Sequence, residues 1–159
     1  MRWDLIDKFE VLKKGRFSRA VKSFSGDEDF FSENFPGHPL VPETLLLEMI
    51  AQAGGVLFGL SLDFKKEVIL AKISNASFGK PVPPPCRLSV EARLEEEREE
   101  GAWISGAVKA AGQTVAQAKM LLVTFESLER SFAGKVVFNE GFLNHFDIYN
   151  VAKMSEGKF

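Results

Sequence analysis

The chain has 159 residues and a mass of 17.7 kDa, which is one ordinary domain with enough residues to bury a core. Hydrophobic residues make up 45% and charged residues 26%, and this composition excludes a disordered chain. The formal net charge of −2 disfavours nucleic-acid binding, and the single cysteine, Cys86, excludes an internal disulfide and a cysteine-based metal site.

The N-terminal part of the chain predicts a short helix and then a strand. Trp3, Ile6 and Phe9 stand at helical spacing, which indicates at most a short amphipathic helix over residues 3–9. Residues 16–24 alternate polar and apolar side chains, as a strand does, and residues 26–29 form a turn.

The most distinctive segment runs from Asn34 to Pro42 and contains three prolines and one glycine. This composition forbids a helix or a regular strand, so we expect a shaped loop. Residues 43–60 then predict a helix that is apolar nearly all round and therefore buried, with Glu43 at its positive end. Its interior polar side chains, Glu48 and Gln52, are four residues apart and share a face.

This apolar helix resembles a membrane span, but a carboxylate in its middle argues against insertion. The first 12 residues lack the hydrophobic core of a secretion signal. We therefore expect a cytoplasmic protein without membrane insertion.

The second half of the chain predicts an antiparallel meander. Residues 68–78 are apolar, residues 80–85 form a stiff proline-rich connector, and residues 87–95, 102–110 and 114–125 alternate. The acidic run 95–100 is expected at a solvated hairpin tip. The sequence thus predicts an α+β fold in which a curled antiparallel sheet wraps a long buried helix.

Residues 127–159 follow the predicted sheet as a C-terminal extension. Phe142, Leu143, Phe146 and Tyr149 stand in it at helical spacing. They predict a helix that packs on the sheet or across the mouth of a pocket, or that simply extends the core or a dimer contact.

Glu48 is the strongest candidate for chemistry, because a carboxylate in an otherwise buried helix is paired, protonated or functional. The loop before the helix presents backbone N–H groups beside a helix N-terminus, which suits an oxyanion. His38 in that loop and His145 in the extension are more typical of surface residues. Cys86 follows three prolines and is expected to be a packed thiol.

The segment Asn34-Phe35-Pro36-Gly37-His38-Pro39-Leu40-Val41-Pro42, followed by Glu48 and the Ala51–Gln52 pair, resembles the signature of the 3-hydroxyacyl-[acyl-carrier-protein] dehydratases. These are hot-dog-fold enzymes of bacterial fatty acid synthesis. Residues 78–83 are similar to the family's Phe-x-Lys-Pro-Val segment. The resemblance implies a hot-dog domain over residues 1–126, and we expect the extension 127–159 to pack on the same domain.

The resemblance also implies the site. In the family, two subunits form one continuous sheet, with an acyl tunnel at the seam, a histidine from one subunit and an acid from the other. The acid matches Glu48, and the thioester carbonyl matches the backbone at Glu43 and Thr44. Gly37 and Gln52 are the further substrate-binding candidates.

Two positions depart from the family pattern. Asn34 stands where the family has its histidine, and Glu43 replaces a loop glycine, which would be strained if that glycine had a positive φ. An amide cannot act as a base near neutral pH. The acid is therefore retained and the histidine is lost, with His38 as a weak substitute four residues on.

Three functions follow from this pattern. The first is a dehydratase-like lyase that acts on 3-hydroxyacyl thioesters of acyl carrier protein or coenzyme A. The second is a non-catalytic or half-catalytic acyl-binding subunit that pairs with a histidine-bearing partner. The third is a thioester hydrolase in which Glu48 activates water. We expect a homodimer, a higher oligomer or a heterodimer, and no cofactor or metal.

Overall fold

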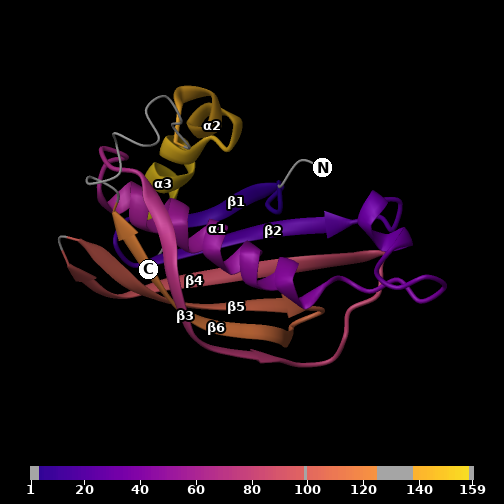
Figure 1. Ribbon diagram of the computed structural model, residues 1–159. Helices are drawn as coiled ribbons and strands as arrows, with labels where there is room; N and C mark the ends of the chain where they lie inside the picture. Colours follow the sequence, from indigo (N-terminus) through magenta and orange to yellow (C-terminus); the bar gives the residue numbers. More distant parts are fainter. Residues whose placement is uncertain (1–3, 99, 125–137, 158–159) are drawn as a thin grey trace.

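The computed structural model describes residues 4–98, 100–124 and 138–157, and its described strands form one antiparallel sheet curled around a long helix (Figure 1). The strand order is β1-β2-β4-β5-β6-β3. The strands are β1 (Lys8–Lys13), β2 (Phe17–Phe24), β3 (Val68–Phe78), β4 (Cys86–Arg98), β5 (Gly101–Ala110) and β6 (Gln113–Thr124). The helices are the 3-10 turn η1 (Asp29–Ser32), α1 (Glu43–Ser61), α2 (Glu140–His145) and α3 (Ile148–Glu156). This arrangement confirms the predicted α+β hot-dog fold.

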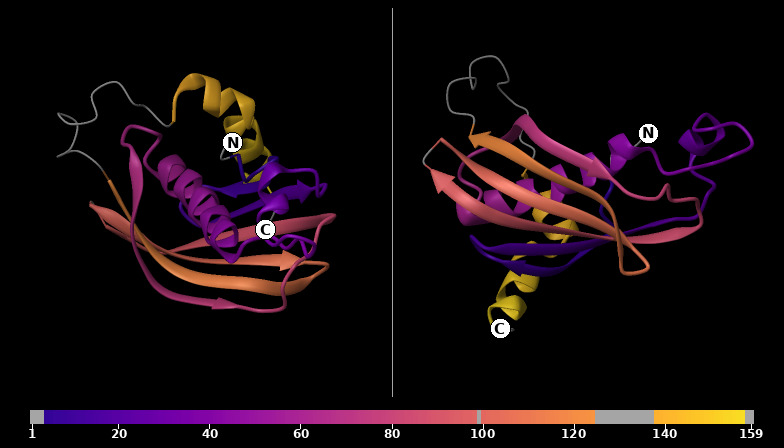
Figure 2. Two further views of the ribbon diagram at one scale, coloured as in Figure 1. Left: turned by 45° about the vertical axis from the view of Figure 1, so that its right-hand side comes forward. Right: turned by 90° about the horizontal axis from the view of Figure 1, so that it is seen from below.

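Helix α1 lies in the concave side of the sheet, as the two further views show (Figure 2). Eleven of its residues are buried, which satisfies the apolar character of almost its whole surface. The sheet packs tightly against the helix at Gly106, where an added Cβ would lie 2.3 Å from Cγ2 of Ile50. The Ser18 hydroxyl of β2 donates to the Ala53 carbonyl of α1 at 3.1 Å. By length and composition α1 could cross a membrane, but here it is the core helix of the sheet.

The alternating segments form strands as predicted. On β4, Leu88, Val90 and Ala92 are fully buried, and the residues between them face outward with partial or full exposure. The acidic run is not confined to a loop, because β4 and β5 stay paired out to Arg98 and Gly101.

The helix predicted over residues 3–9 is wrong. From Lys8 the chain runs as β1 and pairs antiparallel with β2, and the Asp7 N–H donates to the Val21 carbonyl at 2.8 Å. A helix of two turns is marginal in water, whereas the edge of β2 offers backbone partners. Phe9 is nevertheless buried, as its apolar character predicts, while Trp3 lies outside the described residues.

Helix α3 packs against β1, the strand at one edge of the sheet. The buried Ser155 hydroxyl accepts a hydrogen bond from the Leu12 N–H at 3.0 Å and donates to the Val151 carbonyl at 2.7 Å. An edge strand normally leaves such N–H groups open to another chain, and Ser155 pairs one of them where α3 packs on this edge. The described part of the extension, residues 138–157, thereby lies on the body of the fold.

We expect Ser155→Ala to lower the free energy of unfolding by about 1–3 kcal/mol, because the buried Leu12 N–H loses its acceptor. Urea unfolding followed by circular dichroism measures this loss. Ser32→Ala is the matched control, since that exposed hydroxyl also donates to a local carbonyl, that of Asp29 at 2.8 Å, and should change stability by less than about 0.5 kcal/mol. Equal losses in the two variants would contradict the role of Ser155.

Candidate active site

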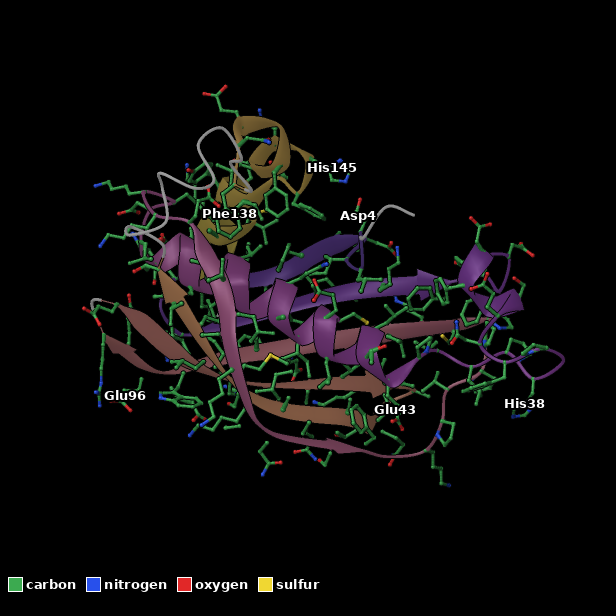
Figure 3. All side chains as sticks on the ribbon, in the orientation of Figure 1. Asp4, His38, Glu43, Glu96, Phe138 and His145 are labelled. Atoms are coloured by element: carbon green, nitrogen blue, oxygen red, sulfur yellow. The ribbon has the colours of Figure 1, made fainter. Side chains whose placement is uncertain are left out.

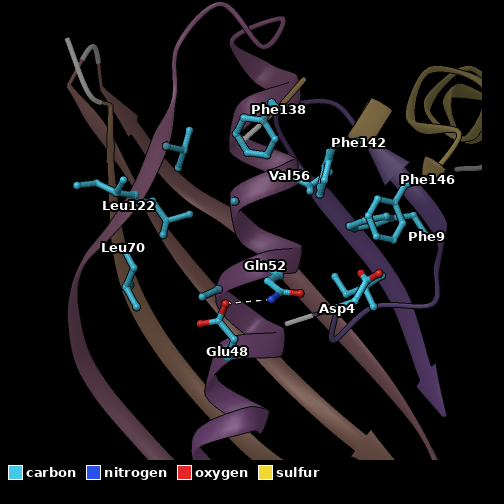
Figure 4. Close-up of a pocket in the computed structure, with 15 residues that line it drawn as sticks. Asp4, Phe9, Glu48, Gln52, Val56, Leu70, Leu122, Phe138, Phe142 and Phe146 are labelled. Atoms are coloured by element: carbon cyan, nitrogen blue, oxygen red, sulfur yellow. Dashed lines mark hydrogen bonds between the residues drawn. The ribbon is translucent and has the colours of Figure 1, made fainter. Parts of the chain in front are cut away.

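Glu48 and Gln52 lie on the face of α1 that the sheet does not cover (Figure 4). Both side chains are half-buried. Gln52 Nε2 donates to Glu48 Oε1 at 3.0 Å, and Gln52 Oε1 accepts from the Leu5 N–H at 3.3 Å. The predicted pairing along one helix face is therefore present. The amide of Gln52 fixes one carboxylate oxygen of Glu48 and ties the helix to the N-terminal segment.

A cavity of about 320 Å³ begins at this pair and follows the outer face of α1. Its walls come from α1, from the start of β3, from the N-terminal segment and from three phenylalanines of the C-terminal extension. The side chains around it are mostly apolar, with the polar groups of Asp4, Glu48 and Gln52 among them. A few polar groups beside an apolar cavity are typical of a small-molecule site.

Asn34 lies in a second hollow of about 400 Å³, together with Glu43 and Thr44 at the start of α1. Asn34 Nδ2 donates to the Phe30 carbonyl at 3.0 Å, and the Asn34 carbonyl accepts from the Leu40 N–H at 3.0 Å. The side chain is thus held in place by its own loop. Within one chain Asn34 and Glu48 do not line the same cavity.

Glu43 is the first residue of α1 and is not among the described residues with a positive φ. The strain expected for a glutamate at a former glycine position is therefore absent. The first N–H groups of any helix lack partners within that helix, and the positive end of the dipole lies there. The backbone at Glu43 and Thr44 can accordingly donate to an oxyanion in the second hollow.

Gly37 and His38 occupy the tip of the loop before α1, where His38 points away from the body of the protein (Figure 3). Gly37 has a φ of +75°, and the His38 N–H donates to the Phe35 carbonyl at 2.8 Å. Both residues are exposed, and neither lines the two hollows just described. The glycine is thus explained by the turn, and the structure places His38 away from Glu48.

Two further candidates lie apart from these hollows. Burial raises the pKa of the Cys86 thiol, and the nearby charge of Glu28 raises it further, as expected for a packed thiol. His145 in α2 is exposed and stands 4.0 Å from the Asp4 carboxylate. Among the residues that the structure describes, no group of three or more His, Cys, Asp or Glu side chains could hold a metal ion.

Sequence reasoning missed part of the cavity wall. Asp4 and Phe138 both line the cavity beside Glu48, and neither was a candidate. Phe138, Phe142 and Phe146 follow one another at intervals of four residues, a signal that marks one helical face. That spacing does not say what the face packs against, which depends on contacts with distant parts of the chain.

Residues 3–119 match the FabA-like domain family. The 3-hydroxyacyl-[acyl-carrier-protein] dehydratase FabZ of Pectobacterium atrosepticum is 36% identical over 120 residues, covering 74% of this chain and 80% of that protein. The protein of the same name from Sodalis glossinidius is 37% identical over the same shares.

Two solved structures share the fold. The dehydratase heterocomplex ApeI:P from Xenorhabdus doucetiae has a TM-score of 0.65 over 84% of this chain and 91% of that chain, at 18% identity. A hypothetical thioesterase protein from Streptococcus pneumoniae TIGR4, solved with coenzyme A, has a TM-score of 0.59 over 74% of this chain and 86% of that chain, at 14% identity. The fold is therefore shared by proteins described as dehydratase and as thioesterase, and it does not by itself decide the reaction.

Proposed function

The chain belongs to the FabA-like domain family, and from this premise we propose that it is a dehydratase-like protein of fatty acid biosynthesis. It removes water from 3-hydroxyacyl thioesters of acyl carrier protein or coenzyme A and yields enoyl thioesters. The observation that carries the proposal is the Glu48 carboxylate at an apolar cavity, with one oxygen held by Gln52 at 3.0 Å.

In this reaction the C2–H and C3–O bonds break, a C2–C3 double bond forms and water leaves. Because Asn34 cannot take up a proton, Glu48 performs both proton transfers: it removes the C2 proton and returns it to the departing hydroxyl. The free N–H groups at Glu43 and Thr44 stabilise the negative charge that develops on the thioester oxygen. Asn34 orients the substrate through the remaining N–H and the oxygen of its amide, and Gln52 is a positioning residue.

The active unit that we propose is a homodimer, since the two halves of the site line different hollows of one chain. Ser155 of α3 covers the Leu12 N–H on the β1 edge. At the opposite edge, β3 pairs with β6, and its other side faces no further strand of the described sheet. Its residues from Ile69 to Phe78 are all exposed, with Ile69, Leu70, Ile73 and Phe78 between 38% and 41%. A second copy that pairs along β3 buries these side chains and brings the Asn34 loop of one subunit to the Glu48 of the other.

A half-catalytic subunit is the second candidate function. It is favoured by the Asn34 side chain, whose Nδ2 is engaged with the Phe30 carbonyl and which provides no base. In that case a histidine-bearing partner chain replaces one copy, and this chain supplies Glu48. A hydrolase that uses Glu48 to activate water is the remaining alternative.

We expect the purified protein to convert a 3-hydroxyacyl thioester into the enoyl thioester, and Glu48→Gln to lower kcat/KM by about 10²–10⁴-fold, because the proton-transfer group is lost. Mass spectrometry distinguishes enoyl thioester, free acid and unreacted substrate. Glu96→Gln, an exposed glutamate on β4 that is paired with Arg98, is the matched control and should leave the rate unchanged. Free acid as the product would contradict the lyase in favour of the hydrolase. Full activity of Glu48→Gln would show that Glu48 does not perform the proton transfers.

We expect Asn34→His to raise the rate of enoyl formation about 10²-fold, because it adds a base where the site has an amide. The same assay measures the gain, and Asn144→His, an exposed residue of α2 that lines neither hollow, controls for a histidine introduced elsewhere. An inactive wild-type protein with an active Asn34→His variant would favour the half-catalytic subunit. If the wild type is active and Asn34→His forms the enoyl thioester no faster, Asn34 does not occupy the position of a base.

A further inference from the structure

The cavity beside Glu48 continues along α1 well beyond the carboxylate. Glu48, Gln52 and Val56 follow one another on one helix face, and the polar side chains stand at one end of this row. Toward the C-terminal end of α1 the lining is apolar. A ligand that fills the cavity therefore has a polar end near Glu48 and an apolar body.

The far end of the cavity is closed by the C-terminal extension. Phe138 lies against the end of α1, where an added Cβ on Gly59 would be 3.0 Å from its ring. The rings of Phe138 and Phe142 are 5.6 Å apart, those of Phe142 and Phe146 are 4.9 Å apart, and Phe146 stacks edge-on against Phe9 at 5.8 Å. Figure 4 shows these rings above Gln52, in a row that runs from Phe138 at the upper part of α1 to Phe146 beside Phe9. Phe138, Phe142 and Phe146 lie outside residues 3–119, which match the family.

Gly55 keeps the middle of the cavity open. It is a lining residue, and an added Cβ would have no heavy atom within 4 Å. Its neighbour Gly54 differs, because a Cβ there would come within 2.9 Å of Ile104. Glycine weakens a helix relative to other residues, and at Gly55 no contact within the chain requires it. The open space at Gly55 therefore belongs to the cavity, and packing of the helix within the chain does not explain the glycine.

We propose that the row Phe138, Phe142 and Phe146 is the end wall of an acyl-chain pocket and sets the longest chain that this protein accepts. The proposal rests on the proposed function in one respect, namely that the ligand is an acyl thioester. From Glu48 to Gly59 the helix rises roughly 16 Å, at about 1.5 Å per residue. An extended chain advances about 1.2 Å per bond, so about 13 bonds reach the wall. Each methylene buried before the wall strengthens binding about fourfold, and methylenes beyond it add nothing.

The test is the affinity of the full-length protein for saturated acyl-pantetheine thioesters from butyryl to octadecanoyl, measured by titration calorimetry. Saturated chains carry no 3-hydroxyl group and therefore cannot be dehydrated, and mass spectrometry of the titrated sample checks that the thioester stays intact. Because Glu48 faces C2, about 13 bonds end near C15, so for the wild type affinity should rise with chain length and stop rising by about hexadecanoyl, where the chain meets Phe138. Phe138→Ala should move this limit to longer chains.

Gly55→Leu provides the opposite change. Leucine is a better helix former than glycine and has open space at this position, so the fold should be retained. The new side chain should fill the cavity, move the limit to shorter chains and weaken binding of the longest accepted chains by at least about tenfold. Met154→Ala is the control in the same extension, because this side chain on α3 is 63% exposed and does not line the cavity.

Unchanged length profiles in both variants, with native circular dichroism, would overturn the proposal. If Phe138→Ala does not fold, Gly55→Leu alone decides. A Gly55→Leu protein that loses self-association on size-exclusion chromatography would place Gly55 against a second copy and would also overturn the proposal.

The pocket assignment and the proposed reaction can fail separately. Length-dependent binding that the variants shift, without any enoyl product, would refute the proposed reaction and leave the pocket assignment standing. Enoyl formation with unshifted binding profiles would refute the pocket assignment alone.

Discussion

The burial of α1 inside the curl of the sheet is the constraint on which the rest of the structure depends. A helix that is apolar on almost every face must be covered on almost every face, and the sheet covers most of it. What remains is a strip of α1 that carries Glu48, Gln52 and Gly55. The polar pair is tolerated because it opens into a cavity and because Gln52 satisfies one oxygen of Glu48. The C-terminal extension covers the far part of the strip with phenylalanine rings.

The same packing separates the groups needed for the reaction into two places along α1. The start of α1 offers unpaired backbone N–H groups beside Asn34, and the middle of α1 offers the carboxylate. Elimination of water needs a proton acceptor and an oxyanion donor around one substrate. The open edge of β3 is where a second subunit completes the arrangement that we propose. Because α3 packs against β1, the β3 edge is where we place that contact.

Much of the fold could be predicted from the sequence, because the strands alternate and α1 is uniformly apolar. The Glu48–Gln52 pair was also predictable, since residues four apart on a helix face each other. Strand β1 was not, because its backbone pairs with β2 and its Leu12 N–H pairs with Ser155, more than 140 residues later in the chain. The position of the phenylalanine row was equally out of reach, because helical spacing shows which side chains share a face but not which distant surface that face covers.

The most direct test of the composite site uses two defective variants, Glu48→Gln and Asn34→Ala, coexpressed with different affinity tags so that the mixed dimer can be isolated. Each variant alone should have little dehydratase activity. Each mixed dimer contains one site with both native residues and one site with neither, so we predict about half of the wild-type activity per dimer. Mixed dimers no more active than the mean of the two variants would contradict the sharing of one site between two subunits.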